Sequence, residues 1–156
     1  MIIVRNARPE DTPAIHLLNQ ECMGYCCSLE KTRSILESLC GRDDHCILVA
    51  ALDEDTVVGY IHLEDYQTLS FDPMKNILGI AVFTEFRRKG IATKLIAAGE
   101  KWARDTGATG IRLVSGDGRE GAHAFYEQMG YVADLDKKIE GETFTCYRME
   151  KVLNDK

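Results

Sequence analysis

The 156-residue chain has 45% hydrophobic and 28% charged residues, which is typical of one globular domain, residues 1–156, and excludes a disordered chain. Its net charge of -6 is uneven, because residues 1–75 contain 6 Lys and Arg against 13 Asp and Glu, whereas residues 76–156 contain 13 against 12. No broad basic face is present, so nucleic acid is not expected as a partner. The acidic half is either a solvated surface or attracts a cationic partner.

The six cysteines and four histidines show neither paired CxxC spacing nor a zinc pattern, so no metal is expected. The longest apolar run, residues 46–52, is too short to cross a bilayer, so no membrane partner is expected. The N-terminus turns polar after four residues and lacks the apolar region of a signal peptide. We therefore expect a cytoplasmic protein with reduced cysteines, in which Cys26 and Cys27 are small buried residues.

The first half of the chain predicts two helices and three strands. Asp11 is placed to cap a helix, with Pro13 close behind it and apolar residues at helical spacing after it. Two β-rich runs joined by the polar residues 53–55 predict an antiparallel hairpin. The expected elements are an edge strand at 2–7, a helix from Asp11, a helix at 28–39 capped by Ser28, and strands at 46–52 and 57–66.

The second half alternates strands with helices. Residues 76–83 form a nearly continuous apolar run, which predicts a central strand covered on both faces, and Gly79 within it indicates a bulge or a close backbone approach. A helix follows Gly90 and ends near Gly107, with an apolar face of Ile91, Leu95, Ala98 and Trp102. The remaining elements are a strand at 110–115, a helix at 122–129, and strands at 131–133 and 143–151.

Residues 87–89, Arg-Arg-Lys, stand directly before Gly90 and the start of that helix. A helix that follows a strand presents unpaired N–H groups at the carboxyl end of the sheet, and its dipole favours negative charge there. Gly90 permits a close approach of the backbone to a phosphate. The sequence lacks GxxxxGK[ST] and GxGxxG, so a pyrophosphate on a carrier other than a nucleoside triphosphate or a dinucleotide is predicted.

Two motifs resemble the GCN5-related N-acetyltransferase (GNAT) family. Residues 87–92, RRKGIA, are similar to its pattern Q/R-x-x-G-x-G/A, and residues 122–131, AHAFYEQMGY, resemble its segment A-x-x-F-Y-E-x-x-G-F/Y. The element order also fits one such domain, so the resemblance covers nearly the whole chain. It implies an α/β (α+β) GNAT fold, with a single mixed, mostly antiparallel central sheet of six to seven strands flanked by about four helices.

The resemblance implies acetyl-CoA as cosubstrate and an amine as acceptor, with direct transfer between them. Backbone amides after the strand would hold the pyrophosphate, and the end of the strand would pair with the pantetheine arm. The N–H of Val82 would donate to the acetyl carbonyl. The cofactor-binding residues implied in this way are Ile80, Ala81, Val82, Arg87, Arg88, Lys89, Gly90, Ile91, Ala92, Thr93, Arg119 and Tyr126.

Tyr126 is the implied general acid. A phenol near the sulfur protonates or hydrogen-bonds the departing thiolate. From spacing alone, Tyr126 beside Phe125 is more typical of a helix core than of a catalytic site, and only the family resemblance favours the catalytic role. Many members of the family carry Asn seven residues before this tyrosine, where the present chain has Arg119. Either Arg119 would reach a phosphate instead, or Asp117, Gly118 and Glu120 would reshape the loop.

The general base is not identified by the motifs. Some members of the family use a Glu early in the strand before the loop, where this chain has residues 75–77, Lys-Asn-Ile. Glu64 is the first candidate, and Asp65, Glu21 and His123 are alternatives. The carboxylates are also typical of a surface, and His123 of helix packing or loop capping.

In the family, the first two helices form the wall of the acceptor pocket, so the acceptor is expected beside them. In this chain the same region carries most of the excess negative charge. We expect a primary amine, either a small cationic amine or a peptide amine, with the protein as a monomer or a homodimer. The alternative hypothesis is a non-catalytic module of the same fold that binds acyl-CoA as a sensor or partner.

Overall fold

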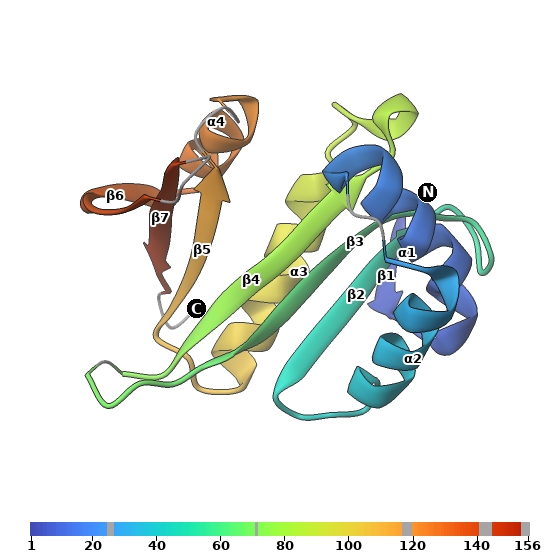
Figure 1. Ribbon diagram of the computed structural model, residues 1–156, viewed down its shortest axis with the longest axis horizontal. Coiled ribbons are helices and arrows are strands. Elements are labelled where there is room, and N and C mark those ends of the chain that lie inside the picture. The colour runs from blue at the N-terminus through green and yellow to red at the C-terminus, as the bar shows by residue number, and fades with distance from the viewer. Residues whose placement is uncertain (25–26, 71, 117–119, 141–144, 154–156) are drawn as a thin grey trace. The chain divides into compact units, whose positions relative to one another are not determined.

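The computed structural model describes residues 1–24, 27–70, 72–116, 120–140 and 145–153, and its strands follow the order β1-β2-β3-β4-β5-β7-β6 (Figure 1). In chain order the main elements are β1 (Ile3–Asn6), α1 (Thr12–Leu18), the π-helix η2 (Asn19–Met23), α2 (Leu29–Leu39), β2 (His45–Ala51), β3 (Val57–Tyr66), β4 (Met74–Val82), α3 (Ile91–Asp105), β5 (Gly110–Gly116), α4 (Glu120–Gln128), β6 (Val132–Glu140) and β7 (Thr145–Val152). Short 3-10 helices cover Pro9–Asp11 (η1) and Thr84–Phe86 (η3). None of the helices in the described part of the chain is long and apolar enough to cross a membrane.

The chain divides into two compact units. The first unit contains Met1–Glu64 and Leu78–Trp102, and the second contains Asp65–Ile77 and Ala103–Lys156. Strands β3 and β4 contribute residues to both units. The expected single domain of residues 1–156 therefore stays a prediction.

The first unit is a layer of strands between helices. β1 pairs antiparallel with β2, and β2 pairs antiparallel with β3. Helices α1 and α2 cover one face of these strands and α3 lies on the other (Figure 1). The core on the α1 and α2 side consists of Ile15, Leu18, Leu36, Val49, Ala51, Val57, Tyr60 and Ala81. The alternation along β3 thus sends Tyr60 to one helical layer and Ile61 to the other.

Two glycines allow close packing in the first unit. A Cβ at Gly59 would lie 2.9 Å from the carbonyl oxygen of Ala81, so β3 can approach β4 only without a side chain there. A Cβ at Gly99 would lie 3.1 Å from Leu63, which brings α3 down onto β3. The position of the β4 backbone at Ala81 therefore depends on glycine at residue 59, and the packing of α3 on β3 depends on glycine at residue 99.

The second unit is built around β5. β4 pairs parallel with β5 from Met74 opposite Gly110 to Ile77 opposite Leu113, while β7 pairs antiparallel with β5 and with β6. Lys75 is buried and forms an ion pair with Asp65. On the opposite side of the strand, Asn76 accepts a hydrogen bond of 2.9 Å from Arg112.

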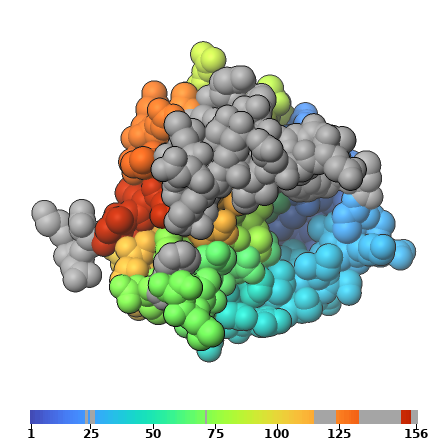
Figure 2. Space-filling view, turned by 60° about the vertical axis from the view of Figure 1, so that its left-hand side comes forward, coloured from blue at the N-terminus to red at the C-terminus, as the bar shows by residue number. Residues whose placement is uncertain are grey.

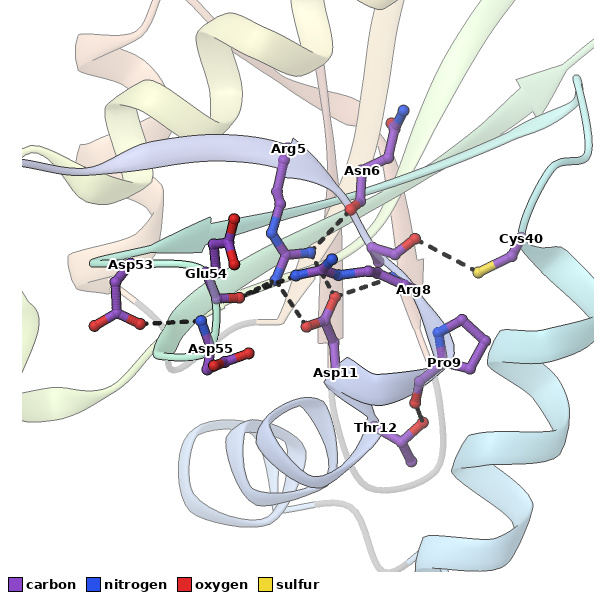
Figure 3. A network of polar contacts seen from close by, with 11 residues as sticks. Arg5, Asn6, Arg8, Pro9, Asp11, Thr12, Cys40, Asp53, Glu54 and Asp55 are labelled. Atoms are coloured by element: carbon purple, nitrogen blue, oxygen red, sulfur yellow. Dashed lines mark hydrogen bonds and ion pairs between the residues drawn. The ribbon is translucent and has the colours of Figure 1, made fainter.

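An ion-pair network ties β1 to the helical layer (Figure 3). The guanidinium of Arg5 donates to both carboxylate oxygens of Asp11, at 2.8 and 2.9 Å, and the Arg8 N–H donates to the same carboxylate at 2.9 Å. Asp11 is 6% exposed. Burial by itself raises the pKa of Asp11, but the hydrogen bonds from Arg5 and Arg8 outweigh it and lower that pKa. Asp11 occupies the N-cap position of α1, as expected, but its side chain makes no capping hydrogen bond to that helix.

Several expected elements are confirmed. β1 is an edge strand, β2 and β3 form the hairpin around residues 53–55, and β4 is central. Ser28 caps α2 by accepting a hydrogen bond from the N–H of Lys31 at 3.1 Å. These predictions succeed because each depends on a local pattern.

Other details were wrong. Leu78 in β4 is 44% exposed, so this strand is not covered on both faces along its whole length. On the expected apolar face of α3, Ile91 and Leu95 are buried as predicted, but Ala98 and Trp102 are only half-buried, because Gly99 rather than Ala98 faces β3. The strand expected at 131–133 extends to Glu140.

Candidate active site

The segment that joins β4 to α3 has an unusual backbone. After η3, Arg87 is extended, Arg88 has a φ of 63° and Gly90 has a φ of 77°. Among the described residues, Arg88 is the non-glycine residue with a positive φ, a conformation that costs about 1 kcal/mol or more. The first helical hydrogen bond runs from the N–H of Lys94 to the carbonyl of Gly90 at 3.1 Å. Backbone N–H groups up to Thr93 therefore precede the regular helical pattern.

The basic side chains of this segment have local contacts. Arg87 Nε donates to the carbonyl of Val82 at 3.2 Å, and Lys89 Nζ lies 5.6 Å from the centre of the Phe86 ring. Arg87 thereby joins the end of β4 to the loop. Ile91 at the start of α3 is buried, whereas Ala92 and Thr93 are small or polar and lie outside the buried core, so the first turn exposes no bulky apolar side chain.

The carbonyl of Val82 accepts a second hydrogen bond, from the thiol of Cys22 at 3.3 Å. Cys22 lies in the π-helix η2, which the sequence did not predict. Single-turn π-helices occur frequently at functional sites. Val82 and Ala81 are buried, at 7% and 5% exposure, so η2 is fastened to a fixed end of β4.

A cavity of about 260 Å³ lies on the α1 and α2 side of the first unit, between α2 and the strands β2 and β3. Its apolar wall includes Ile35 and Leu39 from α2 and Ile47 from β2. Asn19, Tyr60 and His62 provide polar atoms at its lining, and the Tyr60 hydroxyl donates to Asn19 Oδ1. The sequence placed Tyr60 and His62 on one face of the strand but did not reveal the cavity.

His62 forms a contact of 3.0 Å between its Nε2 and Nδ1 of His45, on the neighbouring strand. Burial and the nearby His45 lower the pKa of His62 to about 4, against a smaller opposing effect of Glu64. The imidazole is therefore neutral at physiological pH, and one of the two facing nitrogens donates to the other.

Tyr126 lies in the second unit and is 7% exposed. Its ring centre is 5.4 Å from that of Phe125 and 5.9 Å from that of Tyr131, in an edge-on arrangement with the latter. The carbonyl of Tyr126 accepts a hydrogen bond of 2.9 Å from the N–H of Tyr131, which anchors the strand that follows α4. Tyr126 thus has the aromatic packing of a core residue, and its role in chemistry stays a prediction.

The candidate bases differ in their surroundings. Asp65 is engaged by the buried Lys75, Glu21 is exposed, and Glu64 lies opposite His45 in the β2–β3 register. Arg119 lies outside the described residues, as does the side chain of His123. Within the described part of the chain, no group of three or more His, Cys, Asp or Glu residues could hold a metal ion.

Comparisons with known proteins give the class of the protein. Solved acetyltransferase structures share the fold over almost the whole chain. A GNAT-family acetyltransferase from Streptococcus pneumoniae matches with a TM-score of 0.76 and 18% identity, covering 98% of this chain and 100% of that chain. NAA60 from Arabidopsis thaliana in complex with acetyl-CoA matches with a TM-score of 0.80 and 16% identity, covering 99% of both chains.

A third structure, a ribosomal-protein-alanine N-acetyltransferase from Brucella melitensis, matches with a TM-score of 0.81 and 21% identity, covering 97% of this chain and 99% of that chain. The model of the acetyltransferase (GNAT) family matches residues 12–131. The chain therefore belongs to the GNAT family, and its fold is the mixed, mostly antiparallel GNAT fold that the two motifs implied. A comparison of this sequence with curated proteins found no match.

Proposed function

We propose that the protein is an N-acetyltransferase that moves an acetyl group from acetyl-CoA to a primary amine by direct transfer. The observation that carries this proposal is the segment from Val82 to Ile91, with its two left-handed residues and a helix start directly after the central strand. Such a turn directs successive N–H groups to one point and forms an anion site. That the related NAA60 structure contains acetyl-CoA supports the same carrier.

In this proposal the cofactor is held by the backbone. The N–H groups from Arg88 to Thr93 bind the pyrophosphate, and Ile80 to Val82 pair with the pantetheine arm. Arg87, held by the Val82 carbonyl, stiffens the loop rather than acting as a free charge. The Val82 N–H donates to the acetyl oxygen as negative charge develops on it.

The reaction needs three proton transfers. The acceptor ammonium loses one proton to become a neutral amine, its nitrogen forms a bond to the acetyl carbon, and the same nitrogen loses a second proton as the carbon–sulfur bond breaks. The thiolate of CoA then takes a proton from Tyr126, which is the proposed general acid. The proposed base is Glu64 or water. The neutral imidazole of His62, on the same strand as Glu64, is a further candidate for this role.

The proposal is tested by incubating the protein with acetyl-CoA and a panel of primary amines while free thiol is measured. Thiol release that depends on both protein and amine, together with a mass increase of one acetyl group on the amine, is the expected result. Binding of acetyl-CoA without turnover on any amine would instead favour the sensor or partner module.

The role of Tyr126 is tested by Tyr126→Phe. This variant keeps the aromatic packing against Tyr131 and removes the proton donor, so we expect an unchanged Kd for CoA and a kcat at least about tenfold lower. Phe125→Leu serves as a packing control that leaves the phenol in place. An unchanged kcat for Tyr126→Phe across the pH range would remove Tyr126 from this role.

A further inference from the structure

The cavity between α2 and the β2–β3 strands has a mostly apolar lining. Its apolar lining consists of Ile15, Ile35, Leu36, Leu39 and Ile47. None of the described residues that line it is Asp, Glu, Lys or Arg. The depressed pKa of His62 has burial as its main cause, which agrees with a poorly hydrated environment. The interior therefore suits an uncharged group and disfavours an ammonium.

The cavity is small. At about 30 Å³ for each water-sized group, a volume of 260 Å³ holds about eight or nine non-hydrogen atoms. This is slightly below the range of about 300 to 1,000 Å³ that is typical of pockets for drug-sized ligands. An aromatic ring with a short linker, or an alkyl chain of similar size, matches this volume. Helix α2, which forms the outer wall, lies at the molecular surface (Figure 2).

The polar lining of the cavity connects to the end of β4. Asn19 and Cys22 lie three residues apart in the short π-helix η2. The Cys22 thiol contacts the carbonyl of Val82, and Asn19 accepts the hydrogen bond of the Tyr60 hydroxyl. Tyr60 and Ala81 also belong to the same buried cluster. The polar end of the cavity is thus beside the β4 residues that hold the acetyl group in the proposed function.

We propose that this cavity receives the apolar substituent of the acceptor, whose amine lies at the Asn19–Tyr60 end. The inference rests on the proposed function and adds to it the class of acceptor: a primary amine that carries an uncharged apolar group of about eight or nine non-hydrogen atoms. The acidic residues of the first half remain outside the cavity lining, so they attract the ammonium whereas the cavity selects its substituent.

The test uses two residues of α2 that are exposed to a similar extent. Ile35 lines the cavity and is 53% exposed, whereas Leu29 is 47% exposed and is not among the described lining residues. Ile35→Trp should fill the cavity, and Leu29→Trp is the matched control. The probes are 2-phenylethylamine and methylamine, which have the same charge and differ in their apolar part.

For the wild type we expect kcat/KM for 2-phenylethylamine to exceed that for methylamine at least about tenfold, the lower end of the discrimination that apolar pockets achieve. Ile35→Trp should remove most of this preference, with the KM for acetyl-CoA unchanged, and Leu29→Trp should keep it. Equal kcat/KM values for the two amines in the wild type, or an equal loss in both variants, would overturn the inference.

A second variant guards against misfolding of Ile35→Trp, which thermal melting would reveal. Leu39→Ala enlarges the cavity, so the preference should move from 2-phenylethylamine towards 4-phenylbutylamine by about threefold or more. No change in this preference contradicts the inference.

Saturation-transfer NMR with 2-phenylethylamine separates this inference from the proposed function, because it measures binding without turnover. If no amine is acetylated yet Ile35→Trp selectively weakens this binding, the enzyme proposal fails and the cavity is an apolar ligand site with no acceptor role. If methylamine is acetylated and 2-phenylethylamine does not bind, the enzyme proposal holds and the cavity inference fails.

Discussion

Asp11, which is buried, and His62, which is half-buried, are two titratable side chains whose neighbours differ. Asp11 is surrounded by donors, so its charged form is favoured although it is almost inaccessible to water. His62 faces another imidazole and an apolar cavity, so its neutral form is favoured. In both cases the pKa is lower than usual, but one residue keeps its charge at neutral pH and the other has none.

Asp11→Asn should lower the free energy of unfolding by about 2 to 3 kcal/mol, because it leaves Arg5 without its carboxylate partner. The pair Arg42–Asp44 has the same two-bond geometry, at 2.9 and 2.8 Å, but lies at the exposed surface. Asp44→Asn is therefore the control, and it should change stability little. Urea denaturation of the two variants measures the difference, and equal effects would contradict a special role of Asp11.

The stability that Asp11 contributes should depend on pH. Because its folded-state pKa lies below the ordinary value near 4, the contribution is complete above that value and is lost as the pH falls through the lower pKa. Acid unfolding curves of the wild type and Asp11→Asn should therefore converge at low pH.

His62 should remain neutral well below pH 6.5. Its pKa of about 4 lies below the ordinary 6.5, so its contribution to stability is complete above about pH 6.5 and is lost as the pH falls towards 4. Imidazole ¹⁵N spectra between pH 7.5 and 4 measure this directly. In His45→Asn, the pKa should rise only partly, because burial is the larger cause. A wild-type His62 that titrates near 6.5 would contradict the effect of burial and of His45 on its pKa.

At the scale of elements, the loop between β4 and α3 depends on backbone conformation more than on charge. A Cβ at Gly90 would meet nothing within 4 Å, so any cost of a side chain there comes from the φ of 77°. Lys89, by contrast, is exposed and its charge is screened by salt. The positions of the N–H groups, and not the number of basic side chains, should set the affinity for the pyrophosphate.

Gly90→Val should therefore raise the Kd for CoA at least about tenfold, whereas Lys89→Ala should raise it no more than about threefold. Gly41→Val is the matched control, because Gly41 has a φ of 82° and also has nothing within 4 Å of a Cβ. Gly41→Val should lose stability as Gly90→Val does but keep its affinity for CoA. Calorimetric titration measures all three, and a larger effect of Lys89→Ala would make the loop a simple charge patch.

At the scale of the whole molecule, the two halves of the sequence differ in charge. The first 75 residues carry 6 basic against 13 acidic residues and include the cavity and both helices around it. Charges that surround a site raise the rate at which opposite charges arrive there, and salt weakens this attraction.

We therefore expect kcat/KM for a cationic amine to fall as NaCl rises from 50 to 500 mM, with kcat almost unchanged. A neutral acceptor such as a hydroxylamine is the control, because it has no charge to attract. If both acceptors respond equally to salt, the acidic half does not steer the amine.

The sequence by itself determined the element order, the edge and central strands, and the family. These features follow from local periodicity and from two short motifs, and both depend only on residues that are close together in the sequence. Residues 87–92 also predicted a glycine turn before α3, and Gly90 has the positive φ that this turn requires; anion binding there stays a prediction. The left-handed Arg88 escaped prediction, since arginine at that position has no intrinsic preference for a positive φ.

Only the tertiary structure decided which distant side chains meet. The side chain of Asp11 pairs with Arg5 and not with the N-terminus of α1. Cys22 contacts Val82, which is 60 residues away in the sequence, and His45 in β2 contacts His62 in the neighbouring strand β3. The cavity likewise exists because α2 does not pack fully against β2 and β3, and no local pattern records such a gap. Periodicity reports which face of an element is buried, but the register between elements decides what each buried side chain contacts.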